Sequence, residues 1–129
     1  MAQKIVIDSK EFIFDELTSE TQKLVVSIRY AEERIKEVNK DIALATTALN
    51  TYGLNLSGKL PKEAHPNKKK GVVSVNGKRY VLDDFDEVSK GNLYSMDHCS
   101  KQISRLNNDL AILKTALTTY TERAVATVK

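Results

Sequence analysis

The sequence predicts an α+β fold that is mainly α-helical and consists of two repeats, each a β-hairpin followed by one long helix. Three observations lead to this prediction. Apolar residues recur every seven positions, a hairpin pattern precedes each such stretch, and the second half of the chain repeats the first at a constant offset. We expect the two helices to pair as a coiled coil, preferably antiparallel, around a pseudo-twofold axis.

The helical prediction depends on a heptad pattern that occurs twice. In the first half the heptad positions are Ile28, Ile35, Ile42, Leu49 and Leu56, interleaved with Leu24, Ala31, Val38, Ala45 and Tyr52. In the second half they are Met96, Ile103, Leu110, Leu117 and Ala124, interleaved with Asn92, Cys99, Leu106, Leu113 and Tyr120. A seam with this period is typical of helices that bury one face against a partner helix.

The two halves are related by an internal repeat. Residues 5–60 align with residues 73–128 without a gap, at an offset of 68. Twelve of these fifty-six positions are identical, whereas ordinary residue usage would give about three. We infer a duplication in which the halves bury each other's seams as the subunits of a dimer would, and we expect further assembly into a homo-oligomer.

Hairpins are predicted over residues 4–14 and 72–82. In the second, Asn76-Gly77 separates two apolar runs, and both residues accept the positive φ of a type I′ turn. The first has the turn Asp8-Ser9-Lys10, which lacks a glycine. Because a two-stranded hairpin is marginal in water, we expect each to rest its apolar face on the helices.

Each hairpin leads through an acidic turn into its helix. The first helix is expected over about residues 19–57, with a capping box formed by Ser19 and Gln22. The second is expected over about residues 92–127, beginning after Gly91.

A linker joins the two repeats. Residues 59–71 hold both prolines and five lysines, which is typical of a solvated connection. The first repeat therefore covers residues 1–58 and the second covers residues 72–129, and we expect them to form one compact domain.

The composition fits a cytoplasmic protein. The formal net charge is only +3, so we do not expect nucleic acid as a partner. Nowhere do eighteen apolar residues run together, so no membrane association is expected. The single cysteine, Cys99, lies on the apolar seam and cannot form an internal disulfide.

The sequence offers no catalytic constellation. His65 lies in the linker, and His98 neighbours Cys99 on a helix, where adjacent side chains diverge and do not pair as base and nucleophile. Neither zinc-ligand spacing nor a glycine-rich phosphate loop occurs. We therefore expect no enzyme, no cofactor and no metal site.

Polar residues on the predicted helices are the candidates for ligand binding, and all of them recur in both halves. They are Asn39, Thr47, Thr51 and Tyr52 in the first half and Asn107, Thr115, Thr119 and Tyr120 in the second. One hypothesis is that they line two symmetry-related pockets for a small anionic or nucleotide-like ligand. The alternative is that they satisfy one another across the helix pair. Lys78 and Arg79 are candidate contacts for an anion, together with the basic linker beside them. The alternative for the linker is that it is only a solvated connection.

The segments IVIDSKEFIFDELTSE and TTALNTY, with their copies VSVNGKRYVLDDFDE and KTALTTY, resemble a family of short uncharacterised bacterial and phage proteins. Members of that family have one hairpin, an acidic turn and a single helix ending in a Thr-Ala…Tyr signature. This chain departs from the pattern by being doubled and by having Ser9 where the turn glycine would stand. The resemblance implies no catalytic residues.

We therefore expect a non-enzymatic binding protein. By type, the resemblance suggests a phage accessory factor of the anti-defence kind, acting in the host cell cytoplasm, that sequesters a nucleotide-like ligand or a host protein. The alternative is a structural or oligomerisation coiled-coil module without a small ligand.

Overall fold

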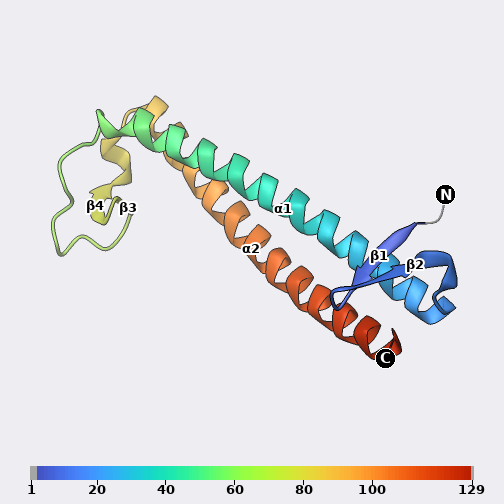
Figure 1. Ribbon diagram of the computed structural model, residues 1–129. Coiled ribbons are helices and arrows are strands. Elements are labelled where there is room, and N and C mark those ends of the chain that lie inside the picture. The colour runs from blue at the N-terminus through green and yellow to red at the C-terminus, as the bar shows by residue number, and fades with distance from the viewer. Residues whose placement is uncertain (1–2, 129) are drawn as a thin grey trace. The chain divides into compact units, whose positions relative to one another are not determined.

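The computed structural model describes residues 3–128 and is mainly helical (Figure 1). Its elements are strands β1 (Lys4–Ile7) and β2 (Lys10–Ile13), the 3-10 turn η1 (Phe14–Glu16), helix α1 (Ser19–Ser57), strands β3 (Val72–Val75) and β4 (Lys78–Val81), the 3-10 turn η2 (Leu82–Asp84) and helix α2 (Glu87–Val128). The strands form two small antiparallel hairpins, and the two helices pack together. Within the described residues, neither helix is apolar enough over a sufficient length to span a membrane.

The described residues divide into two compact units by their contacts. Unit 1 comprises Met1–Ile42 and Arg105–Lys129, and unit 2 comprises Ala43–Ser104. Each unit contains one hairpin and one segment of each helix. The physical reason is that a small hairpin makes its contacts only with the helix segments next to it, so each hairpin organises its own core.

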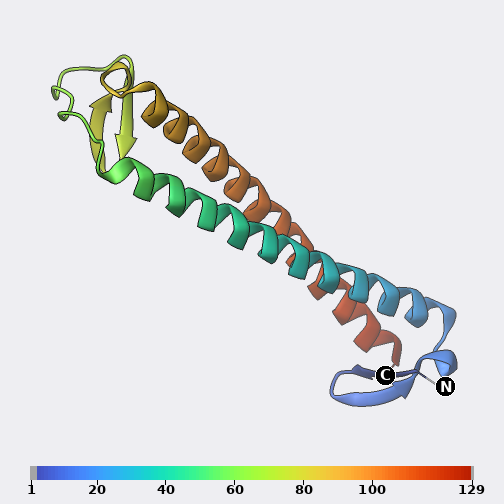
Figure 2. The ribbon, with the colours of Figure 1, turned by 90° about the horizontal axis from the view of Figure 1, so that it is seen from above.

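The core of unit 1 forms where the first hairpin meets both helices (Figure 2). Ile5 and Ile7 of β1 are buried with Val25 of α1 and Ala124 of α2. Beside this cluster the hydroxyl of Thr21 donates a hydrogen bond of 2.7 Å to the hydroxyl of Thr127. Because Thr21 lies near the beginning of α1 and Thr127 near the end of α2, the helix segments of this unit run antiparallel.

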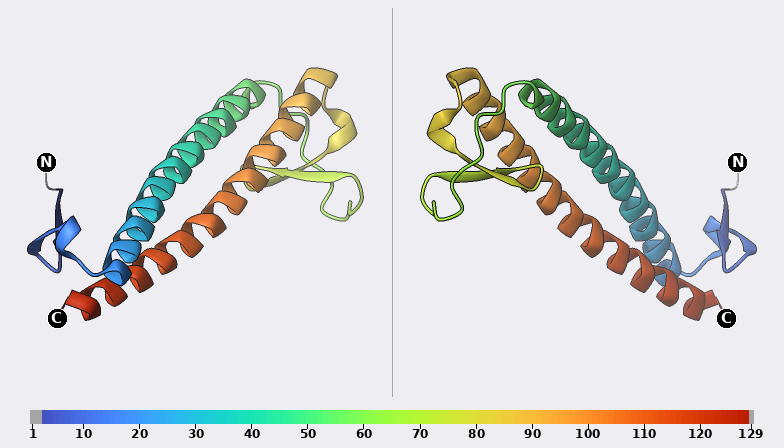
Figure 3. Two further views of the ribbon diagram at one scale, coloured as in Figure 1. Left: turned by 90° about the vertical axis from the view of Figure 1, so that its right-hand side faces the viewer. Right: turned by 90° about the vertical axis from the view of Figure 1, so that its left-hand side faces the viewer.

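The core of unit 2 forms around the second hairpin (Figure 3). Val75 and Tyr80 from the hairpin, Phe85 after η2, and Leu56 of α1 are all buried together. The rings of Tyr80 and Phe85 meet edge to face, with centroids 5.9 Å apart and planes inclined by 73°. This arrangement is favourable for aromatic pairs because the positive ring edge meets the negative ring face.

Both hairpins close through two-residue turns. Ile7 pairs with Lys10, and Val75 pairs with Lys78. The turn residues all have positive φ: 52° at Asp8, 64° at Ser9, 52° at Asn76 and 80° at Gly77. The first turn is therefore as tight as the second, although Ser9 has a side chain and pays the steric cost of the left-handed region.

Helix α1 begins at Ser19, as the sequence indicated, but its capping residue and the beginning of α2 differ from the sequence-based expectation. Ahead of α1 it is Thr18, not Ser19, whose hydroxyl accepts the N–H of Thr21, at 3.2 Å. Helix α2 begins at Glu87, five residues before the expected start near Asn92. The reason is that the carboxylate of Asp86 accepts the N–H of Ser89, at 2.7 Å, and so caps the helix there.

Part of the heptad seam is buried. In unit 1 the buried positions include Ala31, Val38 and Leu106, and in unit 2 they include Ala45 and Cys99. Other seam positions, such as Ile28 and Ile35, are half-buried. Small residues thus occupy several of the most buried positions, where they let neighbouring backbones approach.

Candidate functional site

The polar residues that the sequence singled out lie mainly on the helix surfaces. In unit 1, Asn39, Asn107 and Thr115 are exposed, whereas Thr119 and Tyr120 are half-buried. In unit 2, Thr47 and Thr51 are exposed and Tyr52 is half-buried.

Two pairs of these residues come together, each on one helix. The hydroxyl of Thr51 donates a 3.0 Å hydrogen bond to the carbonyl of Thr47, one turn earlier. Thr115 and Thr119 line a shallow depression of about 280 Å³ together with Lys114 and Thr118. The depression offers hydroxyl groups and one ammonium group, which are donors suited to an anionic ligand.

The predicted anion contacts Lys78 and Arg79 are engaged by the linker. The ammonium of Lys78 lies 3.5 Å from the carboxylate of Glu63. The guanidinium of Arg79 donates to the carbonyls of Pro66, at 3.2 Å, and Lys68. An external anion would therefore have to compete with these intramolecular partners.

A cleft lies beside the first strand of each hairpin, against α2 in unit 2 and against both helices in unit 1. In unit 2 it has a volume of about 400 Å³, and its lining includes Ser74, Val75, Tyr94, Met96 and Ser100. In unit 1 the cleft measures about 250 Å³, and its lining includes Val6, Ile7, Ile28, Glu32 and Leu117. Four of these positions correspond at an offset of 68 residues, so the two clefts are built by equivalent parts of the two repeats.

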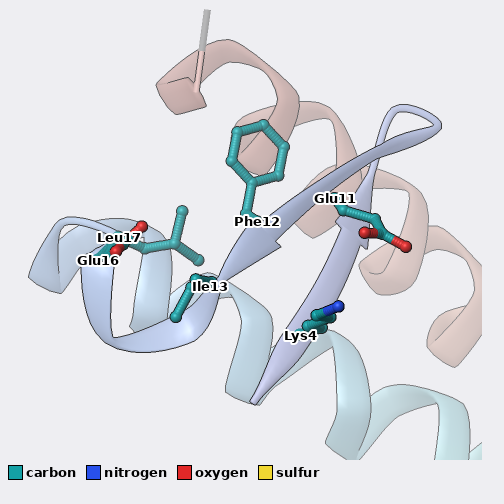
Figure 4. Close-up of a pocket in the computed structure, with 6 residues that line it drawn as sticks. All are labelled: Lys4, Glu11, Phe12, Ile13, Glu16 and Leu17. Carbon is teal, nitrogen blue, oxygen red and sulfur yellow. The ribbon is translucent and has the colours of Figure 1, made fainter. Parts of the chain in front are cut away.

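A second depression of unit 1 follows strand β2 (Figure 4). It has a volume of about 430 Å³. Its lining comes from β1, β2 and the turn after β2, namely Lys4, Glu11, Phe12, Ile13, Glu16 and Leu17. The depression thus combines apolar surface with two carboxylates and the ammonium of Lys4 along one edge of the hairpin.

Sequence reasoning missed this strand edge, although a signal was present. The counterpart of Glu11 in the second repeat, 68 residues later, is Arg79. The side chain at this point of the hairpin is therefore negative in the first repeat and positive in the second. Among residues 3–128, no group of three His, Cys, Asp or Glu side chains is placed to hold a metal ion.

No protein-family model matches the chain, and neither a curated protein nor a solved structure matches it. The function is therefore inferred from the residues themselves.

Proposed function

We propose that this chain is a non-enzymatic binding protein that works as a homo-oligomer, with the outer faces of its helices as the assembly surfaces. The observation that carries the proposal is the exposure of large apolar side chains at equivalent positions of the two helices. Val26 and Tyr94 are 57% and 63% exposed, and Leu44 and Ile112 are 63% and 68% exposed. Large apolar side chains that are exposed at equivalent positions of both helices favour burial of these side chains against a second molecule.

The charges beside these apolar residues are complementary between the two helices. On α1, Val26, Tyr30, Glu33 and Glu37 follow one another at helical spacing on one face. On α2 the equivalent positions hold Tyr94, His98, Lys101 and Arg105. The α1 face of one molecule and the α2 face of another would therefore attract each other.

The existing ion pairs leave these charges available. Glu33 pairs with Lys36 at 3.6 Å, Glu37 pairs with Arg34 at 2.5 Å, and Lys101 pairs with Asp97 at 2.9 Å, all on the same helix as their partner. Exposed pairs of this kind contribute about 0–1 kcal/mol. They can exchange for intermolecular pairs at little cost.

Tandem duplication of a dimer-forming unit accounts for this symmetry. Strands, 3-10 turns and helices of the second repeat each begin 68 residues after their counterparts in the first. This spacing supports an origin of the chain as two fused copies that pair as a coiled coil around a pseudo-twofold axis. An ancestral self-complementary surface is also a suitable starting point for larger assemblies.

Native mass spectrometry of the wild type and the variant Tyr94→Glu tests the proposal. We expect a defined oligomer for the wild type and dissociation for the variant, because a carboxylate would be buried in the interface. Val88→Glu is the matched control, since Val88 is similarly exposed but, six residues earlier, lies on another face of α2. A monomeric wild type at tens of micromolar would refute the proposal, as would equal dissociation of both variants.

A second candidate function is sequestration of a small anionic or nucleotide-like ligand. It is favoured by the depression that Thr115 and Thr119 share with Lys114. A thermal-shift screen with nucleotides should then raise the melting temperature of the wild type and leave that of Lys114→Ala unchanged. If no nucleotide changes the melting temperature, this candidate is eliminated.

A further inference from the structure

Strand β4 in unit 2 has a neighbour on each side. Its inner neighbour is β3, and on its outer edge Glu63 of the linker pairs antiparallel with Tyr80. The N–H of Ala64 donates a 2.8 Å hydrogen bond to the carbonyl of Arg79. A linker segment thus adds to the hairpin as a short third strand, which is how a sheet edge commonly accepts an extended peptide.

Side chains of the hairpin hold this linker segment in place. Glu63 forms its ion pair with Lys78, and the guanidinium of Arg79 holds two linker carbonyls. Leu60 packs against the cluster that contains Tyr80 and Phe85, each of which is only 4% exposed. The segment therefore has four anchors: a backbone hydrogen bond, the carbonyls that the Arg79 guanidinium holds, an acidic side chain and an apolar side chain.

Unit 1 contains the same edge, and no segment among the described residues 3–128 pairs with it as the linker pairs with β4. Lys10, Glu11 and Phe12 of β2 stand where β4 has Lys78, Arg79 and Tyr80. Among residues 3–128, β1 is the only strand paired with β2. Phe12 and Leu17, the counterparts of Tyr80 and Phe85, stay half-buried, and the 430 Å³ depression lies beside them. Figure 4 shows both side chains at this depression.

The backbone of β2 is also oriented for a further strand. Lys10 and Phe12 pair with Ile7 and Ile5 of β1. Backbone groups alternate sides along a strand, so Glu11 and Ile13 direct theirs to the open edge. Glu11 stands at the position of Arg79, whose carbonyl accepts the linker hydrogen bond in unit 2.

We propose that the open edge of β2 binds an extended peptide segment of a partner protein, antiparallel to β2, as the linker lies on β4. The residues by which the linker contacts β4 indicate which residues that peptide should have. An apolar residue, like Leu60, would cover Phe12 and Leu17, and an acidic residue three positions later, like Glu63, would pair with Lys10. This site is separate from the helix faces of the proposed function and goes beyond it.

The edges of β2 and β4 differ in charge, and this difference predicts which peptide binds to β2. Arg79 donates to linker carbonyls, but Glu11 can only accept hydrogen bonds, and Glu16 adds a second carboxylate to the rim of the depression. The partner peptide therefore carries a lysine or arginine after its acidic residue. A peptide with this pattern of apolar, acidic and basic residues matches the charges along the edge.

The test uses the full chain and a fluorescently labelled synthetic peptide with the sequence of residues 59–68, which contains Leu60, Glu63 and Lys68. The tethered linker competes at a high effective concentration on β4, so the free peptide is directed to β2. We expect saturable binding by fluorescence anisotropy. We also expect Lys10→Glu to weaken it about five- to tenfold, because reversing the charge turns attraction into repulsion.

Two controls make the test decisive. Lys78→Glu, the matched variant in unit 2, should bind the peptide as the wild type does, and a peptide with Glu63→Lys should bind Lys10→Glu better than it binds the wild type. Amide NMR shifts on titration should appear at Glu11 and Ile13. Absence of binding at millimolar peptide, or shifts at Arg79 and Val81 instead, overturns the proposal. So does self-association of the wild type that Lys10→Glu abolishes, since a second copy would then occupy the edge.

Discussion

Two glycines in this chain differ in backbone conformation, and so they differ in what an alanine would do in their place. Gly77 has a φ of 80° in the turn between β3 and β4. Gly91 lies inside α2, and a Cβ added there would meet nothing within 4 Å. The same substitution should therefore have opposite effects at the two positions.

We predict that Gly91→Ala raises the free energy of unfolding by about 0.5–1 kcal/mol, because alanine loses less backbone entropy in a helix. This corresponds to a rise of about 2–4 °C in melting temperature. Gly77→Ala should instead lower the free energy of unfolding by about 1–2 kcal/mol, because its Cβ would crowd the carbonyl in the left-handed region. Thermal unfolding followed by circular dichroism measures both. Equal changes at both sites would contradict the prediction.

At the scale of secondary-structure elements, the two helices begin with different caps. Thr18 caps α1 through a neutral hydroxyl, and Asp86 caps α2 through a carboxylate. The hydrogen bond from the N–H of Ser89 lowers the pKa of Asp86 below its ordinary value of 3.8. Only the second cap therefore depends on pH.

The sign of this dependence follows from the lowered pKa. The Asp86 carboxylate stabilises the folded state above its unfolded pKa, and this stabilisation is lost as the pH falls below about 4. Asp86→Ala should therefore lower the melting temperature at pH 7 but have a smaller effect at pH 3. Thr18→Ala should cost about 1 kcal/mol at both pH values. A penalty for Asp86→Ala that is the same at pH 7 and pH 3 would contradict this assignment.

The sequence predicted the type of most elements but not all of their bounds. Asn76-Gly77 predicted the second hairpin because few other residue pairs accept two positive φ values. The start of α2 was misplaced because Gly91 and Asn92 favour a helix end, while the decisive signal was the single capping residue Asp86. Local propensity is a weak guide wherever packing and capping keep a glycine within a helix.

The candidate sites were harder to predict than the elements. Repetition identified the polar residues of the helices, but it carries no information about their exposure. The linker, rich in proline and lysine, indicated only a solvated connection. Its antiparallel pairing at Glu63 involves a single residue pair and has no periodicity, so only the folded backbone reveals it.

At the scale of the whole molecule, the complementary helix faces predict how charge controls assembly. Glu33→Lys should weaken the oligomer because it places like charges opposite Lys101 of a neighbouring molecule. Lys101→Glu should weaken it for the same reason. Because each mutant keeps one wild-type face, mixing the two should restore at least one of the intermolecular pairings. Light scattering after size-exclusion chromatography measures the mass, and a mixture that stays as dissociated as each mutant alone would contradict the model.

The position of the linker also limits how this chain can be shortened. The segment from residue 58 to residue 71 is longer than most connections inside compact domains, which commonly have two to eight residues. The extra length has a structural role, because it lets the linker pair with the outer edge of β4. Deletions there would uncover main-chain donors and acceptors that can pair with strands of other molecules, so the apparently dispensable loop protects unit 2 against aggregation.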